Sequence, residues 1–270
     1  MDKPPSRYSV QIALDQKLLE VKGKSHDLCC AWGFLWDGSN DPIYNIVGWI
    51  SPMDSPVETI AWDEKYYITA SKRGHRHGKM VNKAMEATPI VGGQEFIVTD
   101  FQHTEVRKGP DTLGKDSFGY RIELKCSIVL NLALDLEELA ADNSTPAFIA
   151  SEGEEPLDLG KTGAITPTKT LLFFFVKKNI LERRHGFNFK LLEHLPIVYD
   201  YGNQSTQFTK IKLVYKDSRP QLSPDVEAKK NESLLFLMAR QPVPRLEDTF
   251  ESIPMEENSR QGATQNEPKY

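Results

Sequence analysis

Apolar residues occupy every second position of the chain between residues 118 and 136. Alternation with a period of two is typical of a β-strand that has one apolar and one polar face. The apolar positions are Phe118, Tyr120, Ile122, Leu124, Cys126, Ile128, Leu130, Leu132, Leu134 and Leu136. One strand of this length would span about 60 Å at ~3.3 Å per residue, whereas strands average about 5–6 residues. The pattern has two interpretations: a long, bent strand in a sheet with one wet face, or a segment that can join a transmembrane β-barrel, whose strands need about 9–11 residues.

The composition is that of a folded chain with ample core. The 270 residues are 39% apolar and carry a formal net charge of −5, which argues against general nucleic-acid binding. No apolar run approaches the ~18 residues of a transmembrane helix, and residues 1–6 open no secretory signal. The three cysteines are an odd set with two adjacent members, which predicts a reducing, cytoplasmic setting without a disulfide framework.

Enzyme motifs are missing from the sequence. There is no Gly-x-Ser-x-Gly elbow, no P-loop, no dinucleotide fingerprint and no His-Glu-x-x-His. Cys126 falls on the apolar face of the alternating segment, so we expect it to pack and not to act as a nucleophile. His75-x-His77 lacks a third ligand at a matching spacing. We therefore expect no catalytic residues, no metal and no cofactor.

The remaining patterns predict a fold of the α+β class. Strand-like segments cover residues 8–13, 27–36, 43–50, 60–70, 95–101, 165–176 and 209–215. The turn-rich residues 37–42 should join the second and third of these as a hairpin. Short helices are expected over 188–195 and 225–240. The prediction is a twisted mixed or antiparallel sheet with long amphipathic hairpins, a few short helices, and tryptophans and adjacent cysteines in strands, one cysteine of the pair packing inward.

The chain divides by composition near residue 240. Residues 241–270 are rich in Pro, Glu, Gln, Asn and Ser and poor in apolar side chains, which predicts a flexible tail. This tail has six acidic and three basic residues and so carries −3 of the net charge of −5. We expect a folded domain over residues 1–240 and an acidic tail over 241–270.

Two basic groups are candidates for contact with acidic phospholipids. The first group is Lys72, Arg73, Arg76, Lys79 and Lys83. The second group follows the apolar strand 165–176 and contains Lys177, Lys178, Arg183 and Arg184. Each Lys or Arg near an anionic membrane surface contributes about 1 kcal/mol. A loop that only solvates its charges, or cations that extend from beside a core strand, would explain the same residues.

The alternating segment, the acidic link 137–164 and the strand 165–176 form a candidate membrane hairpin. The residues that would face lipid are Phe118, Tyr120, Ile122, Leu124, Ile128, Leu130, Leu132 and Leu134. The residues that would line a wet lumen are Arg121, Glu123, Lys125, Asn131 and Asp135. Because the acidic link must cross the bilayer, we expect insertion to occur only in concert, as closed oligomers without unpaired edges.

Strand motifs in the N-terminal half carry a resemblance to a known family. They are Val10–Gln16, Asp27–Trp32, Tyr44–Trp49, Ile60–Trp62 and Tyr67–Ala70. With them the N-terminal half of the chain resembles fungal gasdermin-like proteins of the heterokaryon-incompatibility and regulated-cell-death type, and the expected architecture extends the match to about residue 240. The resemblance implies a gasdermin N-terminal-domain fold and a pore-forming cell-death effector. Such a protein would bind cardiolipin or phosphatidylserine, form homo-oligomers and insert two β-hairpins per subunit.

The resemblance also implies a means of activation. In the fungal group a short C-terminal extension can hold the protein inactive until a partner protease removes it, and 241–270 has a suitable length. We expect cleavage between Leu234 and Leu246, after an apolar residue such as Phe236 or Met238 for a subtilisin-like protease, or after Arg240 for an arginine-specific one. Loss of the tail removes a net −3, so the basic groups would be less offset near anionic lipid. The protein would then move from the cytoplasm to the plasma membrane or a mitochondrial membrane.

The chain departs from the animal and the bacterial gasdermins in two respects. The full inhibitory domain of the animal proteins does not follow the first 240 residues, and the first cysteine is Cys29, so the N-terminal lipidated cysteine of the bacterial proteins is missing. The alternative function is a soluble β-rich binding or allorecognition module without membrane activity.

Overall fold

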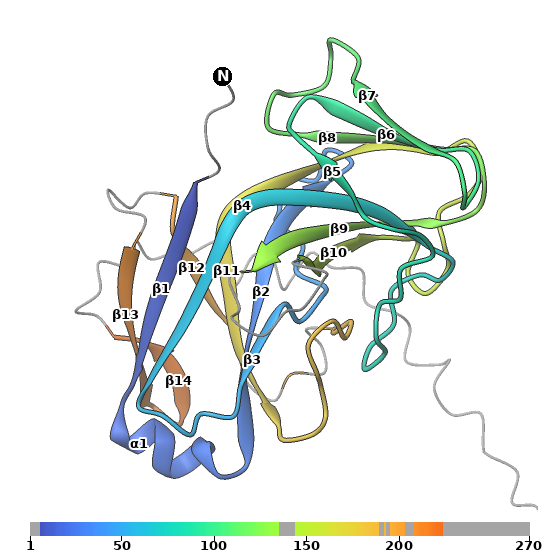
Figure 1. Cartoon of the computed structure of the whole chain (residues 1–270). Coiled ribbons are helices and arrows are strands. Elements are labelled where there is room, and N and C mark those ends of the chain that lie inside the picture. Colours follow the sequence, from blue (N-terminus) through green and yellow to red (C-terminus); the bar gives the residue numbers. More distant parts are fainter. Residues whose placement is uncertain (1–5, 135–143, 189–191, 193–194, 203–207, 224–270) are drawn as a thin grey trace, which may run out of the picture. The chain divides into compact units, whose positions relative to one another are not determined.

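The computed structural model describes residues 6–134, 144–188, 192, 195–202 and 208–223, which form two seven-stranded β-sheets (Figure 1). Sheet A has the order β10-β9-β4-β1-β13-β14, with β5 paired to β4. Its strands are β1 (Arg7–Leu14), β4 (Val57–Ser71), β5 (Thr88–Ile90), β9 (Ser127–Leu134), β10 (Ser144–Ala150), β13 (Phe208–Lys216) and β14 (Arg219–Leu222).

Sheet B has the order β3-β2-β11-β8-β6-β7, with β12 paired to β11. Its strands are β2 (His26–Trp36), β3 (Trp49–Ser51), β6 (Gln94–Val98), β7 (Thr104–Lys108), β8 (Phe118–Ile122), β11 (Thr162–Lys177) and β12 (Ile197–Asp200). Both sheets are mixed, because β1 pairs in parallel with β13 and β6 in parallel with β8 while the other pairs are antiparallel.

The expected mixed sheets are present, whereas the described residues hold little of the helix that the α+β prediction includes. In the described residues the one α-helix is α1 (Gln16–Leu18), which continues as the π-helical turn η1 (Leu19–Gly23). The side chain of Asp15 caps α1 by accepting a hydrogen bond from the Leu18 amide at 2.8 Å. The helix expected over 188–195 falls mostly outside the described residues, and the helix expected over 225–240 falls wholly outside them.

Most of the strands expected from the sequence exist and are longer than expected. The predicted strands 8–13, 60–70, 165–176 and 209–215 fall within β1, β4, β11 and β13. The hairpin expected over 27–50 is confirmed only in outline. β2 pairs with the short β3 at one end, and Phe34 forms an isolated bridge with Ile43 near the turn.

The single long strand predicted over 118–136 is wrong. The chain leaves sheet B after β8 and enters sheet A as β9, with bends at residues 123–125. Both sheets turn their inner faces to one shared core, so the even-numbered residues of β8 and β9 point into it from opposite sheets. Alternation reports which side of a strand faces apolar surroundings, and therefore it continues unbroken through the change of sheet.

The polar face predicted for this segment is also wrong in its second half. Ser127, Val129 and Asn131 are fully buried, because loops cover the outer face of β9. In the first half the expectation holds better. Arg121 pairs with Glu95 at 3.4 Å, and Lys125 pairs with Asp158 at 3.6 Å near the protein surface.

The predicted hairpin of 118–136 with 165–176 does not form as such. β9 lies between β4 and β10, whereas β8 contacts β11 only where Phe118–Arg121 pairs with 162–165. The acidic link contains the strand β10, which pairs antiparallel with β9. The part of the link over 137–143 lies outside the described residues.

Aromatic side chains dominate the core between the sheets. Trp62 stacks on Tyr8 with ring centroids 5.5 Å apart and meets Trp32 edge-on at 5.7 Å. The adjacent cysteines are both buried, and one of them packs inward between the sheets as expected. Cys30 belongs to the core between the sheets, and Cys29 to a second apolar cluster with Phe174 on the other face of sheet B.

Tyr120 ties β8 to β2 by hydrogen bonds at the edge of the core. Its hydroxyl accepts from the Trp36 indole at 2.8 Å and donates to the Asp37 carboxylate at 3.1 Å. Asp37 in turn accepts from the Ala164 amide of β11 at 3.1 Å. The network fixes where β8 sits in sheet B.

We expect Tyr120→Phe to lower the free energy of unfolding by about 1–2 kcal/mol, because the half-buried Trp36 indole loses its acceptor. Chemical denaturation measures the change. Tyr215→Phe is the matched control, since its hydroxyl donates to the Ser218 carbonyl in an exposed turn and its loss should cost less than about 0.5 kcal/mol. Equal effects of the two variants would contradict the role of Tyr120.

Candidate anion-binding surface

Three segments that are distant in sequence lie side by side on the outer face of sheet A. The Val81 amide donates to the Arg184 carbonyl at 2.9 Å, and the Arg184 amide donates to the Val47 carbonyl at 2.8 Å. The Gly186 amide donates to the Lys79 carbonyl at 2.9 Å. The structure thus joins parts of the two basic groups that the sequence analysis treated separately. We call these segments, residues 45–47, 73–83 and 183–186, the basic loops.

Two glycines allow the basic loops to pack this closely. A Cβ at Gly74 would lie 2.3 Å from the carbonyl carbon of Glu154, and a Cβ at Gly186 would lie 2.4 Å from the Arg76 carbonyl oxygen. Larger residues would push the backbones apart. Arg184 itself adopts a left-handed backbone with φ of 72°, which is strained for a residue with a side chain.

The basic loops rest directly on β9 and β10. Ile46 and Val81 pack with Val129 of β9 and Ile149 of β10 in a small buried cluster. The side-chain amide of Asn45 donates to the Ile149 carbonyl at 2.8 Å and accepts from the Ile149 amide at 3.2 Å. Asn45 therefore provides hydrogen-bond partners for the backbone groups of Ile149 at the edge of β10, as a neighbouring strand would.

Three cations line a small cavity in the basic loops. The cavity has a volume of about 170 Å³ and is lined by Arg73, Arg76 and Lys79, with Val81 and Ile149 at its apolar wall. Arg76 pairs with Glu154 at 3.1 Å. Within the described part of the chain, Arg73, Lys79 and Arg184 have no carboxylate partner. Two uncompensated cations beside a cavity of this size suit an anion such as a phosphate group.

The two histidines of the first basic group serve the packing of the loops. The His75 ring nitrogen Nε2 lies 2.9 Å from the Asn45 carbonyl oxygen, so this nitrogen carries a proton and donates. Burial lowers the pKa of His75 below its ordinary value of 6.5. His77 accepts from the Asn188 amide through Nδ1 at 3.1 Å. Neither ring is arranged with further ligands, and the described residues contain no group of three His, Cys, Asp or Glu side chains suited to a metal ion.

Other predicted lipid-contact residues lie elsewhere or contribute less. Lys72 sits over the Phe101 ring at 5.0 Å, and Lys83 is half-buried in the loop beyond Val81. Lys177 and Lys178 are at the end of β11, where Lys178 lies 3.9 Å from the Asp54 carboxylate. Arg183 precedes Arg184 and is half-buried. The structure therefore gathers Arg73, Arg76, Lys79, Arg183 and Arg184, and not the whole predicted set.

The residues predicted to enter a membrane lie in the core between the sheets. Phe118, Tyr120, Ile122, Ile128, Leu130 and Leu132 are 0–2% exposed, and Leu124 is half-buried against them. Leu134 is the last residue of β9. The predicted cleavage residues Phe236, Met238 and Arg240, and the tail 241–270, lie outside the described residues. In the described residues no helix is long and apolar enough to cross a membrane.

Sequence reasoning missed the residue that seats the basic loops. Asn45 and Ile149 are separated by 104 residues, and a single asparagine beside an apolar segment gives no signal of a long-range contact. The available signal was weak: a polar residue with two donors and one acceptor between Tyr44 and Ile46, both of which are buried.

Comparisons with known proteins add no relative. No protein family matches the chain, no curated protein has a significantly similar sequence, and no solved structure is significantly similar. The resemblance to fungal gasdermin-like proteins therefore stays a prediction.

The half-buried His75 predicts that acid destabilises the basic loops. Its pKa is lowered on folding, so as the pH falls below 6.5 the unfolded chain takes up a proton that the folded chain does not. The free energy of unfolding should therefore decrease from pH 7.5 to pH 5.5, by up to ~1.4 kcal/mol per pH unit from this group. His75→Gln retains a donor and should show a shallower decrease. Urea titrations at the two pH values test this, and an unchanged decrease in the variant would contradict it.

Proposed function

We propose that the protein binds acidic phospholipids through the basic loops and then permeabilises the membrane, as a pore-forming effector of the gasdermin-like kind. One observation carries the proposal: the uncompensated cations lie on loops that cover β9, the strand whose sequence is suited to a membrane hairpin. The residues that would contact lipid and the residues that cover β9 thus belong to the same loops.

The first step is recognition of a lipid phosphate. Arg73 and Arg76 can each present a planar pair of donors to phosphate oxygens, and Lys79 adds a point charge. Several cations that act together at an anionic surface add about 1 kcal/mol each. Arg76 would exchange its exposed ion pair with Glu154 for the phosphate, which costs little because exposed pairs are weak.

The second step is release of β9 from its cover. The outer face of β9 holds two buried polar atoms for which the described residues offer no partner: Ser127 Oγ and Asn131 Oδ1. Burying such an atom without a partner costs about 1–3 kcal/mol. When lipid draws the basic loops away, this face becomes hydrated and the cost is relieved. A wet lumen would provide the same hydration, with the even-numbered face toward lipid.

The proposed removal of the tail is compatible with the two sheets described above. The last described strand, β14, ends at Leu222, so cleavage after Phe236, Met238 or Arg240 would remove none of the described strands. We propose that a protease acts there, that the body 1–240 then forms homo-oligomers in the membrane, and that the tail restrains it beforehand. Equal dye leakage from vesicles treated with 1–240 and with the whole chain would refute the restraint.

The alternative function is a β-rich binding or allorecognition module that keeps every strand folded. The observation that favours it is the burial of both faces of β9, which makes release of the strand costly. Under this alternative the cavity in the basic loops binds an anion without any change of fold, and vesicles stay intact.

Reversal of two cavity charges should impair lipid binding. We expect Arg73→Glu with Lys79→Glu to weaken binding of the body to cardiolipin or phosphatidylserine vesicles by about 30-fold or more, since two contributions of about 1 kcal/mol are lost. Co-sedimentation measures binding. Lys212→Glu with Lys216→Glu on β13 makes the same change in net charge at exposed positions away from the loops. An equal loss in this control would show that only total charge matters.

A reversible lock on β9 tests the strand release. Ser71 and Ser127 are paired between β4 and β9, at a spacing that a disulfide can bridge. Both are buried and one atom different from cysteine, so Ser71→Cys with Ser127→Cys should leave the fold intact. We expect the oxidised 1–240 variant to bind vesicles without leakage and to regain leakage after reduction. Leakage by the fully oxidised form would contradict release of β9.

A further inference from the structure

Two β-bulges face each other across the core, one in each sheet. β4 advances three positions from Asp63 to Tyr66 while β9 advances one, and this places Glu64 and Lys65 in a bulge. β11 advances four positions from Pro167 to Leu171 while β2 advances two, and this places Lys169 in the middle of a second bulge. Bulges re-aim side chains and are frequent beside functional sites.

The two bulges are joined by an ion pair between the sheets. Lys169 pairs with Glu64, and its ammonium also lies 3.4 Å from the Tyr8 hydroxyl and 5.1 Å from the centre of the Tyr8 ring. Backbone bonds hold both bulges in place: the Glu64 amide donates to the Ser6 carbonyl at 2.7 Å, and the Tyr201 amide donates to the Lys169 carbonyl at 2.8 Å. The charges are thus presented by ordered backbone.

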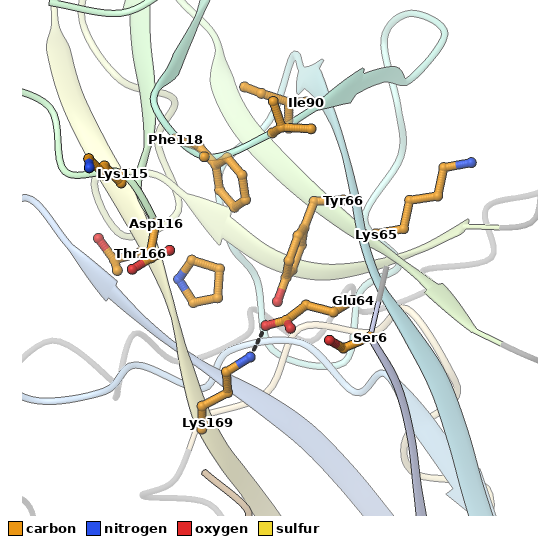
Figure 2. A pocket seen from close by; sticks show the side chains of 13 residues that line it. Ser6, Glu64, Lys65, Tyr66, Ile90, Lys115, Asp116, Phe118, Thr166 and Lys169 are labelled. Atoms are coloured by element: carbon orange, nitrogen blue, oxygen red, sulfur yellow. Dashed lines mark hydrogen bonds and ion pairs between the residues drawn. The ribbon is translucent and has the colours of Figure 1, made fainter. Parts of the chain in front are cut away.

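A cavity of about 720 Å³ opens above this ion pair (Figure 2). In Figure 2 Tyr66 extends toward Glu64, and Phe118 and Ile90 lie farther from Lys169, toward the other end of the cavity. The Tyr66 and Phe118 rings are 5.0 Å apart, and Pro167 adds a further apolar surface. The volume is within the range of about 300–1,000 Å³ for small-molecule sites.

The polar end of the cavity is accessible to a ligand. The Lys169 side chain is 39% exposed and that of Glu64 is 25% exposed. Both charged groups are therefore accessible from the cavity while most of their surface is shielded from bulk water. The charged residues that line the cavity are Lys65, Lys115, Lys169, Glu64 and Asp116. Lys115 and Lys169 are the cations on the cavity side, because the Lys65 ammonium lies 5.2 Å from the centre of the Tyr67 ring and in Figure 2 points away from the other labelled side chains. An apolar body with a single negative head group matches this lining.

We propose that this cavity is a binding site for a small amphipathic monoanion, a carboxylate on an alkyl or aryl body. The head group lies at the polar end beside Lys169, and the apolar body lies against Tyr66, Phe118 and Ile90. The site involves none of the residues of the basic loops, so it stands without the proposed function.

Calorimetric titration of the whole chain with sodium decanoate, below its micelle concentration and without vesicles, tests the site. We expect one saturable site and a rise in melting temperature at saturation. Decan-1-ol and decyltrimethylammonium have the same body without the negative charge and should bind at least tenfold more weakly. No saturable binding of decanoate, or equal binding of decanol, would overturn the proposal.

Two variants locate the binding. Val91 lines the cavity rim and is 63% exposed, so Val91→Trp should fill the rim without disturbing the core and weaken decanoate binding at least tenfold. Leu159→Trp is the matched control, since Leu159 is 69% exposed and does not line the cavity. It should bind as the parent chain does. Unchanged binding in Val91→Trp, or equal losses in both variants, would refute this location.

The head-group contact is tested by Glu64→Gln with Lys169→Met, which removes both charges together and leaves neither one unpaired. We expect at least a tenfold loss of decanoate affinity and unchanged affinity for decanol. Circular dichroism and denaturation check the fold of this double variant. If it fails to fold, Val91→Trp still decides the matter. Full decanoate affinity in a folded double variant would refute the assigned head-group position.

Discussion

The inner faces of both sheets share one apolar layer, and the rest of the structure depends on that layer. β8 and β9 come from opposite sheets, yet their even-numbered side chains meet in it. Burial of this much apolar surface, at ~25 cal/mol per Å², is the main stabilising contribution in such a fold. The shared apolar layer also determines which face of each sheet is the outer one. The basic loops can cover β9 because its inner face is already committed to the core, and the two bulges face each other because β4 and β11 lie on opposite sides of it.

How much could be predicted from the sequence depends on the range of the interaction. β1, β4 and β13 follow from local alternation, which a strand with one buried face imposes on its own residues, and β11 follows from an apolar run that is buried on both faces. The change of sheet at residues 123–126 does not, because side-chain alternation is the same on both sides of it. Contacts between distant residues leave no local pattern at all. Glu64 and Lys169 are separated by 105 residues, and each alone looks like an ordinary surface charge.

The sequence predicted the basic residues of the candidate site, but it did not predict which of them lie together in the fold. Density of Lys and Arg marks residues 72–83 as basic in any fold, but only tertiary structure brings Arg184 beside them. The same loops then explain why Asn131 and Ser127 are buried although their pattern predicts a wet face. A surface feature and a buried strand are coupled through four apolar side chains and one asparagine. That coupling links anion binding at the surface to the exposure of a polar strand face.

Asn45 has a consequence for how copies of this chain could meet. β10 ends the order of sheet A, and an end strand presents unpaired amides and carbonyls that can template pairing with another chain. The side-chain amide of Asn45 forms hydrogen bonds with both backbone groups of Ile149, and it therefore blocks the pairing of another strand at this position of the edge. If the segment 45–47 left the sheet, these hydrogen bonds of Asn45 would be lost at the same time. Self-association through β10 would then begin only in molecules whose basic loops have already left the sheet.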